Sequence, residues 1–421
     1  SDVYKRQPPS LSIIIYGKEE TAMEEKKLRS GFTTGTCAAC AAKAAAVMLL
    51  QREEVECVQV MTPGGTRAEL LLHDAERTEH SAVCAVRKDA GDDPDVTDQA
   101  LIYASVEYIK DSGDPDMCYR NNHIFLTGGP GVGIVTKPGL ACPVGLHAIN
   151  PVPRKMIFEE VEAVARSAGC EGRLLVRIWI PEGERLALST FNPKLGIEGG
   201  ISVLGTSGIV EPMSEAALRA TIQLELHMKA VAGQREVILT PGNYGENFLK
   251  ETLNLSLAQG VQCSNFVQDS VIMAADEGMN GLLFVGHVGK LIKVAGGVGN
   301  THSKYGDRRM EIMWDCARIH CEEMAESDRN RLKDQVLASN TTEEAVIWLE
   351  KAGVLKPAMM TAVERMKQYV EEWSGRAVCA EVVTFTNGYG ILGMTCGAEN
   401  MIEAFRIREE ANEMQKEQKR E

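Results

Sequence analysis

Hydrophobic and polar residues are arranged differently in the two halves of the chain. In the first half, strand-like runs at residues 55–61 and 173–181 are mixed with helical patterns at 37–46 and 156–168. Strands and helices that follow no regular alternation are typical of an α+β domain. We therefore predict an N-terminal α+β domain over residues 23–231.

The second half follows a regular order of strand, loop and helix. Buried-strand runs at 237–239, 262–266 and 281–285 are each followed by a loop and a helical pattern. This alternation predicts a parallel sheet, with ligands expected at the carboxyl ends of its strands. We assign this α/β domain to residues 232–405 and a charged, solvated tail to residues 406–421.

Residues 1–22 match neither pattern. Residues 1–7 read like a vector-derived scar, and the apolar run at 13–15 is too short for a secretory signal. We expect a non-native or disordered leader, with Met23 as the natural start. No run of about 18 apolar residues occurs in the sequence, so we expect no membrane partner.

Composition narrows the classes of partner. The 421 residues are 44% hydrophobic and 25% charged, which is ordinary for a globular protein. The formal net charge of −14 argues against binding nucleic acid or an anionic membrane through the overall field. An anionic ligand would therefore need a local basic site. Twelve scattered cysteines do not form a disulfide scaffold, which favours a cytoplasmic location.

Two glycine-containing segments suggest a nucleotide site but do not satisfy its spacing. Residues 128–137 lack the P-loop pattern, and Gly289 with Lys290 lacks the upstream glycine. A small-molecule kinase is therefore only a weak option.

No set of residues has the spacing of a metal site. Cys37 and Cys40 have no second pair of ligands, whereas zinc typically takes four. We place Cys316, His320 and Cys321 on one helix, where His320 and Cys321 do not share a face. Buried structural cysteines are the better interpretation, and we expect no metal bound by the protein itself.

A Thr/Gly loop leads directly into the alanine-rich helix at residues 37–46. Thr33, Thr34, Gly35 and Thr36 form this loop, in which Thr34 or Thr36 can serve as N-cap. The alternative is that the loop and the helix N-terminus bind an anion. The residues alone do not separate the two interpretations.

Charged residues gather in several rigid loops. Residues 89–95 carry four carboxylates around a glycine and a proline, which predicts either a solvated turn or a group that orients a cation or supplies a base. Four cations in Gly/Pro-constrained loops would be either ordinary surface charges or a basic site for carboxylates or phosphates. These cations are Lys137, Arg154, Lys155 and Lys194.

Seven segments, in order, resemble the cobalt-precorrin-5B (C1)-methyltransferase family of anaerobic cobalamin biosynthesis. They are residues 29–39, 88–97, 133–140, 148–156, 192–211, 239–245 and 286–307. The resemblance runs from about residue 28 to the end of the chain. The sequence departs from the family pattern at Ser30, at Leu146-His147 and at Asp98-Gln99.

The resemblance implies an S-adenosylmethionine-dependent methyltransferase. Its substrate is a cobalt corrinoid precursor that carries acetate and propionate groups. The methyl group goes to ring carbon C1 and gives cobalt-precorrin-6A, and cobalt enters only with the substrate. The implied fold has two domains, α+β then parallel-sheet α/β, unlike the common methyltransferase folds. The alternative is a non-catalytic corrinoid-precursor carrier or scaffold. The resemblance leaves open whether the protein forms a homo-oligomer.

The resemblance also suggests roles for single residues. Asp92 and Asp93 would be catalytic, as a base or as the carboxylate that faces the sulfonium. Substrate carboxylates would be held by Thr33, Thr34, Gly35, Thr36, Lys137, Arg154, Lys155 and Lys194. The methyl donor would be held by Thr240, Pro241, Gly242, Asn243, Tyr244, Gly245, Gly286, His287, Gly289 and Lys290.

Overall fold

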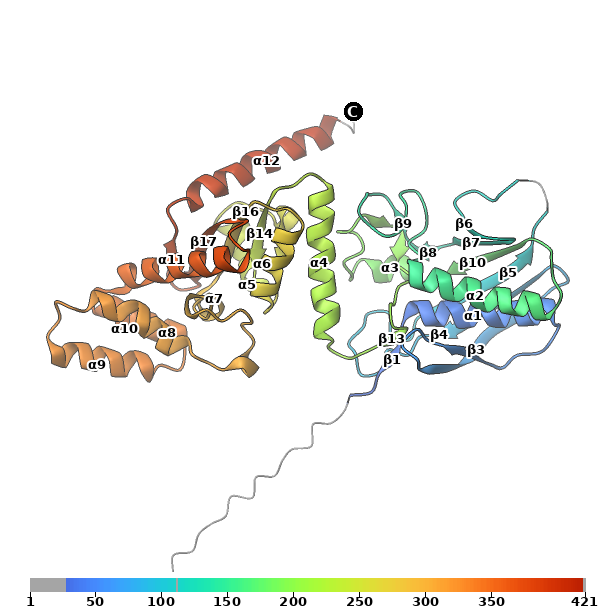
Figure 1. Cartoon of the computed structure of the whole chain (residues 1–421), viewed down its shortest axis with the longest axis horizontal. Helices are drawn as coiled ribbons and strands as arrows, with labels where there is room; N and C mark the ends of the chain where they lie inside the picture. Colours follow the sequence, from blue (N-terminus) through green and yellow to red (C-terminus); the bar gives the residue numbers. More distant parts are fainter. Residues whose placement is uncertain (1–27, 111–112, 419–421) are drawn as a thin grey trace, which may run out of the picture.

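A computed structural model describes residues 28–110 and 113–418 of the chain. They form two bodies, and helix α4 (Glu215–Val231) lies between them (Figure 1). The leader predicted for residues 1–22 lies outside the described residues.

The N-terminal body contains a seven-stranded sheet. All neighbouring strands in it are antiparallel except β10 and β7, which run parallel. This gives the mostly antiparallel sheet of a mixed fold. In spatial order the strands are β2 (Cys57–Met61), β3 (Arg67–Arg77), β4 (Ser81–Arg87), β5 (Leu101–Tyr108), β10 (Leu174–Trp179), β7 (Ile124–Gly128) and β6 (Tyr119–Asn121).

Two helices cover one face of this sheet, α1 (Thr34–Leu50) and α2 (Pro151–Ser167). Nearly all of α1 is buried, including every alanine from Ala38 to Ala46. Alanine has no side chain beyond Cβ, so α1 can pack closely on α2, β4 and β5.

Strands β3 and β5 are absent from the sequence-based prediction. β5 buries Ile102, Ala104 and Val106 at alternate positions, because one of its faces packs on α1. An alanine at the middle buried position and a charged Glu107 near the end weaken the apolar signal of this run.

Short strands tie the glycine-rich loops of this body together near α4. β1 pairs with β13, β8 with β12 and β9 with β11. A short helix, α3 (Gly183–Ala187), lies against β12. The strands are β1 (Gly31–Phe32), β8 (Gly131–Val132), β9 (Ile134–Val135), β11 (Ile197–Glu198), β12 (Gly200–Ile201) and β13 (Ile209–Val210).

The C-terminal body contains a five-stranded, mostly parallel sheet, which confirms the α/β prediction for this half. Only β18 runs antiparallel to its neighbour. The strand predicted at 262–266 is misplaced, because the chain turns at Cys263 and Ser264 adopts a positive φ of 51°. In spatial order the strands are β15 (Gly260–Gln262), β14 (Glu236–Thr240), β16 (Gly281–His287), β17 (Cys379–Thr386) and β18 (Gly390–Met394).

The strand order of this sheet creates a switch point. In chain order the strands are second, first, third, fourth and fifth, so the connections leaving β14 and β16 go to opposite sides. In open parallel sheets, ligands bind where neighbouring connections diverge in this way. The switch point therefore lies at the carboxyl ends of β14 and β16.

Helix α4 packs with the C-terminal body. Its buried Ile222 and Leu226 belong to the same hydrophobic core as Val237 and Phe284 of the parallel sheet. The other helices here are α5 (Asn243–Glu251), α6 (Val267–Asp276), α7 (Val288–Leu291), α8 (Arg309–Ala317), α9 (Glu326–Leu337), α10 (Thr342–Lys351), α11 (Leu355–Trp373) and α12 (Ala398–Gln418).

The single helix predicted to carry Cys316, His320 and Cys321 is wrong. α8 ends at Ala317, and residues 318–320 form a 3₁₀ turn, so only Cys316 is on the helix. Within the described residues, no helix has the length and apolar character needed to span a membrane.

Candidate functional site

The loops predicted to hold the methyl donor meet at the switch point. Residues 240–245 contain the last residue of β14 and the loop after it, and residues 286–290 contain the end of β16 and the residues after it. We call these two segments the switch site. The ring centroids of Tyr244 and His287 are 5.8 Å apart. A Cβ on Gly242 would lie 3.2 Å from Lys290 Nζ. The structure therefore brings the two predicted segments together.

Two glycines shape the first loop. Gly242 has a φ of +85° and is the N-cap of α5, a position where a side chain would be strained. Gly245, in the first turn of α5, lies so close to Thr240 that a Cβ would be 1.5 Å from its Oγ1. Thr240 is fully buried, and its hydroxyl has no hydrogen-bond partner among the described residues.

His287 is held in one tautomer at the end of β16. Its Nδ1 accepts from the Gly289 N–H (3.1 Å), and its Nε2 is 3.0 Å from Glu343 Oε1. Burial lowers the pKa of His287, and the nearby Glu343 charge only partly opposes this. The imidazole is therefore neutral near pH 7, with its proton on Nε2 toward Glu343.

The Thr/Gly loop is a buried joint. Thr33 is the N-cap of α1, so the prediction of Thr34 or Thr36 is wrong. The helix begins at Thr34, and Thr33 is the last extended residue, with its Oγ1 accepting from the Thr36 N–H (3.2 Å). The Gly35 N–H donates to the Leu204 carbonyl (2.9 Å). These donors are used within the chain, which favours capping over anion binding.

The acidic loop lies directly beside this joint, because Phe32 N–H donates to the Asp89 carbonyl (2.8 Å). Asp92 accepts from the Arg29 N–H (2.7 Å), and Asp93 accepts from the Met213 N–H (2.9 Å). The two catalytic candidates thus hold neighbouring segments in place, and Asp92 is also exposed to solvent.

A buried ion pair underlies the same loop. The ammonium of Lys88, whose side chain is 1% exposed, is 2.7 Å from Asp95 Oδ2. Burial alone would raise the pKa of Asp95, but Lys88 and the hydrogen bonds from Thr97 outweigh it and lower that pKa. The sequence analysis missed Lys88, because a lone lysine after a strand reads as a surface residue.

The four predicted substrate cations form two pairs. Arg154 stacks over Tyr119, with 4.2 Å from its Cζ to the ring centroid, and lines a hollow of about 400 Å³ together with Lys155. Lys155 is exposed and lies 3.7 Å from Glu159.

The second pair, Lys137 and Lys194, lies near Lys229 of α4. Burial lowers the pKa of Lys229 to about 8; the carboxylate of Glu225 opposes the shift, while the two other lysines add to it. Sequence analysis missed Lys229 because its helical pattern carries no special signal.

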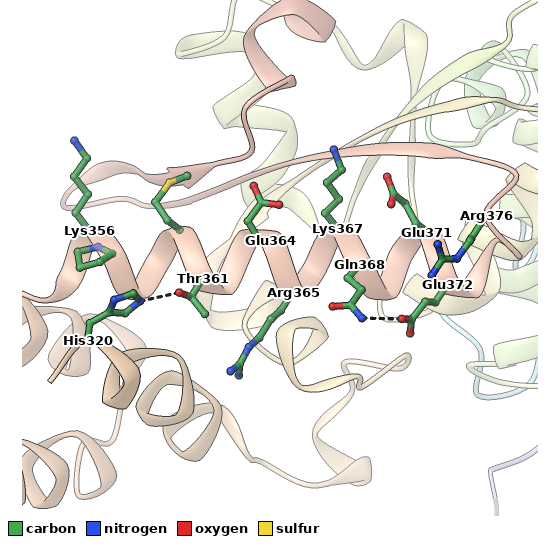
Figure 2. A pocket seen from close by; sticks show the side chains of 12 residues that line it. His320, Lys356, Thr361, Glu364, Arg365, Lys367, Gln368, Glu371, Glu372 and Arg376 are labelled. Atoms are coloured by element: carbon green, nitrogen blue, oxygen red, sulfur yellow. Dashed lines mark hydrogen bonds between the residues drawn. The ribbon is translucent and has the colours of Figure 1, made fainter. Parts of the chain in front are cut away.

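A hollow of about 950 Å³ lies along α11 and contains none of the predicted site residues. Figure 2 shows Lys356, Glu364 and Lys367 on one side of the helix and Arg365 on the other. Lys367 is paired with Glu381 (2.8 Å). Across the described part of the chain, no three His, Cys, Asp or Glu side chains gather as a metal site.

Two family models match different parts of the chain. The CbiD family model matches residues 21–212, and the CbiD C-terminal domain model matches residues 300–396. The cobalt-precorrin-5B C(1)-methyltransferase of Ruminiclostridium cellulolyticum is 42% identical over 362 residues, which are 86% of this chain and 90% of that protein.

The chain belongs to the CbiD family of cobalt-precorrin-5B C(1)-methyltransferases. Its Clostridioides difficile relative of the same name is 37% identical over 413 residues, covering 92% of this chain and 100% of that protein. A solved structure of the cobalamin biosynthesis protein cbiD from Archaeoglobus fulgidus is 29% identical, covers 64% of this chain and 80% of that chain, and has a TM-score of 0.35. The resemblance inferred from the seven segments is confirmed as CbiD membership.

Proposed function

We propose that this chain methylates C1 of cobalt-precorrin-5B with S-adenosylmethionine and forms cobalt-precorrin-6A. The observation that carries the proposal is the 42% identity to a cobalt-precorrin-5B C(1)-methyltransferase across 90% of its length. We further propose a cytoplasmic location. We also propose that the C-terminal domain begins at α4 rather than at Ala232, because α4 packs in the C-terminal core.

The reaction requires the protein mainly to align the methyl donor with the corrinoid. The sulfonium methyl is already activated, so the new C–C bond forms as the C–S bond breaks and its electron pair stays on sulfur, giving S-adenosylhomocysteine. Holding donor and carbon in this geometry lowers the entropic part of the barrier. A base is needed only if the product loses a proton, and Asp92 and Asp93 are our candidates for that role.

The donor is assigned to the switch site. This assignment is supported by the position of residues 240–245 and 286–290 at the carboxyl ends of β14 and β16, two parallel strands whose following connections diverge. Tyr244, 63% exposed, offers an aromatic face for a flat base.

The corrinoid is assigned to the N-terminal body. Its carboxylates would meet Arg154 and Lys155 at the start of α2, and Lys137 and Lys194, which face Lys229 on the neighbouring helix α4. This local basic site would bind a polyanion despite the net charge of −14. The Thr/Gly loop supports this site indirectly, as the joint that fixes the acidic loop.

Anaerobic incubation with cobalt-precorrin-5B and methyl-labelled donor tests the activity. We expect label at C1 of the product and stoichiometric S-adenosylhomocysteine. Tight corrinoid binding without label transfer and without donor binding would favour the carrier or scaffold.

A further inference from the structure

Lys290 is a half-buried cation without an anionic partner. Across the residues that the structure describes, its ammonium makes no ion pair, and no carboxylate is among the groups that act on its charge. Burial lowers the pKa of Lys290, and the groups that act on its charge are the Cys263 thiol and a second ammonium, that of Lys293. A half-buried ammonium in such surroundings gains by binding an anion.

Two carboxylates close to the switch site are engaged elsewhere. Glu246, in the first turn of α5, accepts from Gln262 Nε2 (2.9 Å). Glu343 faces His287, at 3.0 Å from its Nε2. The positive charge of Lys290 is therefore not balanced by the chain itself.

The N-terminus of α5 faces the same ammonium. This nine-residue helix has no side-chain cap, and its N-cap Gly242 lies beside Lys290, with 3.2 Å from an ideal Cβ to Nζ. Helix N-termini attract anions through unpaired N–H groups and the helix dipole. The buried Thr240 hydroxyl, which lies against Gly245 in the first turn, has no partner either. Unpaired buried hydroxyls are rare and mark places where a ligand or water completes the bonding.

We infer that Lys290 and the N-terminus of α5 form a carboxylate subsite, and that its ligand is the α-carboxylate of the methyl donor. This inference rests on the proposed function, because it presupposes S-adenosylmethionine at the switch site. A carboxylate of the corrinoid substrate is the other group that could bind in the same subsite. The donor is favoured because the subsite lies at the switch point, whereas the cations proposed for the corrinoid lie at α2 and near α4.

Two thioether ligands test the subsite by calorimetry. One is S-adenosylhomocysteine, and the other is its decarboxylated analogue, which lacks only the carboxylate. A charge-assisted hydrogen bond contributes about 1.5–3 kcal/mol, or roughly 10- to 100-fold in Kd. We expect the wild type to bind the full ligand tighter by this factor. Lys290→Met should weaken the full ligand by the same factor and change the analogue by less than about threefold.

The matched control is Lys250→Met, which removes an exposed lysine from the last turn of α5, the helix whose N-terminus forms the subsite. It should leave both affinities unchanged. Equal affinity of the wild type for the two ligands would overturn the subsite, and this arm needs no variant. Equal weakening of both ligands by Lys290→Met would also overturn it and would leave the donor assignment intact. If the wild type binds neither ligand, the donor assignment fails, and the subsite fails with it.

A corrinoid carboxylate in the subsite would give different changes in KM and in ligand affinity. If the corrinoid carboxylate occupies the subsite, Lys290→Met raises the substrate KM and leaves both thioether affinities unchanged. That result would overturn the inference for the donor.

Discussion

The two bodies use their polar loop residues differently. In the N-terminal body, the Thr/Gly loop is hydrogen-bonded to Leu204 and Gly208. The acidic loop is hydrogen-bonded to Arg29, Phe32 and Met213. At the switch site, the Lys290 ammonium and the Thr240 hydroxyl are unpaired within the described residues. The Thr/Gly loop and the acidic loop therefore stabilise the N-terminal body. The two loops of the switch site instead keep polar groups that a ligand could bind.

The largest effect should come from the ion pair below the acidic loop. Lys88→Met leaves Asp95, whose side chain is 25% exposed, without its buried partner. Breaking a fully buried pair on one side costs about 3–5 kcal/mol, so we expect a loss of about 3 kcal/mol, at the lower end of this range. Urea denaturation measures the loss in the free energy of unfolding. Adding Asp95→Asn should recover part of it, because the orphaned charge is removed. A loss below about 1 kcal/mol would contradict a structural role for this loop.

The same pair makes stability depend on acid. Because the folded pKa of Asp95 is lowered, its contribution is complete above the unfolded pKa and is lost as pH falls through the folded pKa. Unfolding followed between about pH 5 and 2 should show a shallower loss in Lys88→Met than in the wild type. Parallel pH profiles would contradict the assignment.

The second effect tests how closely Gly245 packs on Thr240 at the switch site. Gly245→Ala places a methyl group on Thr240 Oγ1 and should destabilise the protein by about 1–3 kcal/mol, although alanine favours helices elsewhere. Gly388→Ala is the control, because nothing lies within 4 Å of the added Cβ. Thermal unfolding of both variants gives the comparison. A stabilised Gly245→Ala would show that the loop is looser than described.

The third effect separates the two proposed ligand sites. Arg154→Gln should raise the substrate KM by roughly 10-fold, the lower end for a lost charge-assisted bond, and change the donor KM less than about twofold. Arg166→Gln, at the exposed far end of α2, is the control. Steady-state kinetics with each ligand varied in turn gives both values. A larger effect on the donor KM would exchange the two assignments.

The smallest effect concerns Lys229. Its pKa of about 8 lies below the usual value of about 10.4 for lysine, so between these values the unfolded chain holds the extra proton. Stability should therefore rise with pH over that range. Substrate KM should instead rise about twofold to threefold as pH passes 8, because one cation is lost. Lys229→Arg should remove both trends, and a variant that keeps them would place their origin elsewhere.

The sequence predicted the parallel sheet well because its strands are continuous apolar runs between loops. It could not say that β14 lies between β15 and β16, since strand order is set by long-range packing. β5 was missed because its buried face includes Ala104, which carries little hydrophobic signal. The bonds of Asp92 and Asp93 join residues 63 and 120 positions apart, so no local pattern could predict them.

Helix α4 has a mechanical consequence. Its Glu215 and Arg219 are bonded to Lys304 and Asp269 of the C-terminal body, whereas Met213, just before the helix, is held to the other body by Asp93. Met213 is 74% exposed and has a φ of 55°. The short connector at residues 211–214 thus joins the body proposed to bind the donor to the body proposed to bind the acceptor. Under these two assignments, the conformation of the connector helps to set the distance that the methyl group must cross.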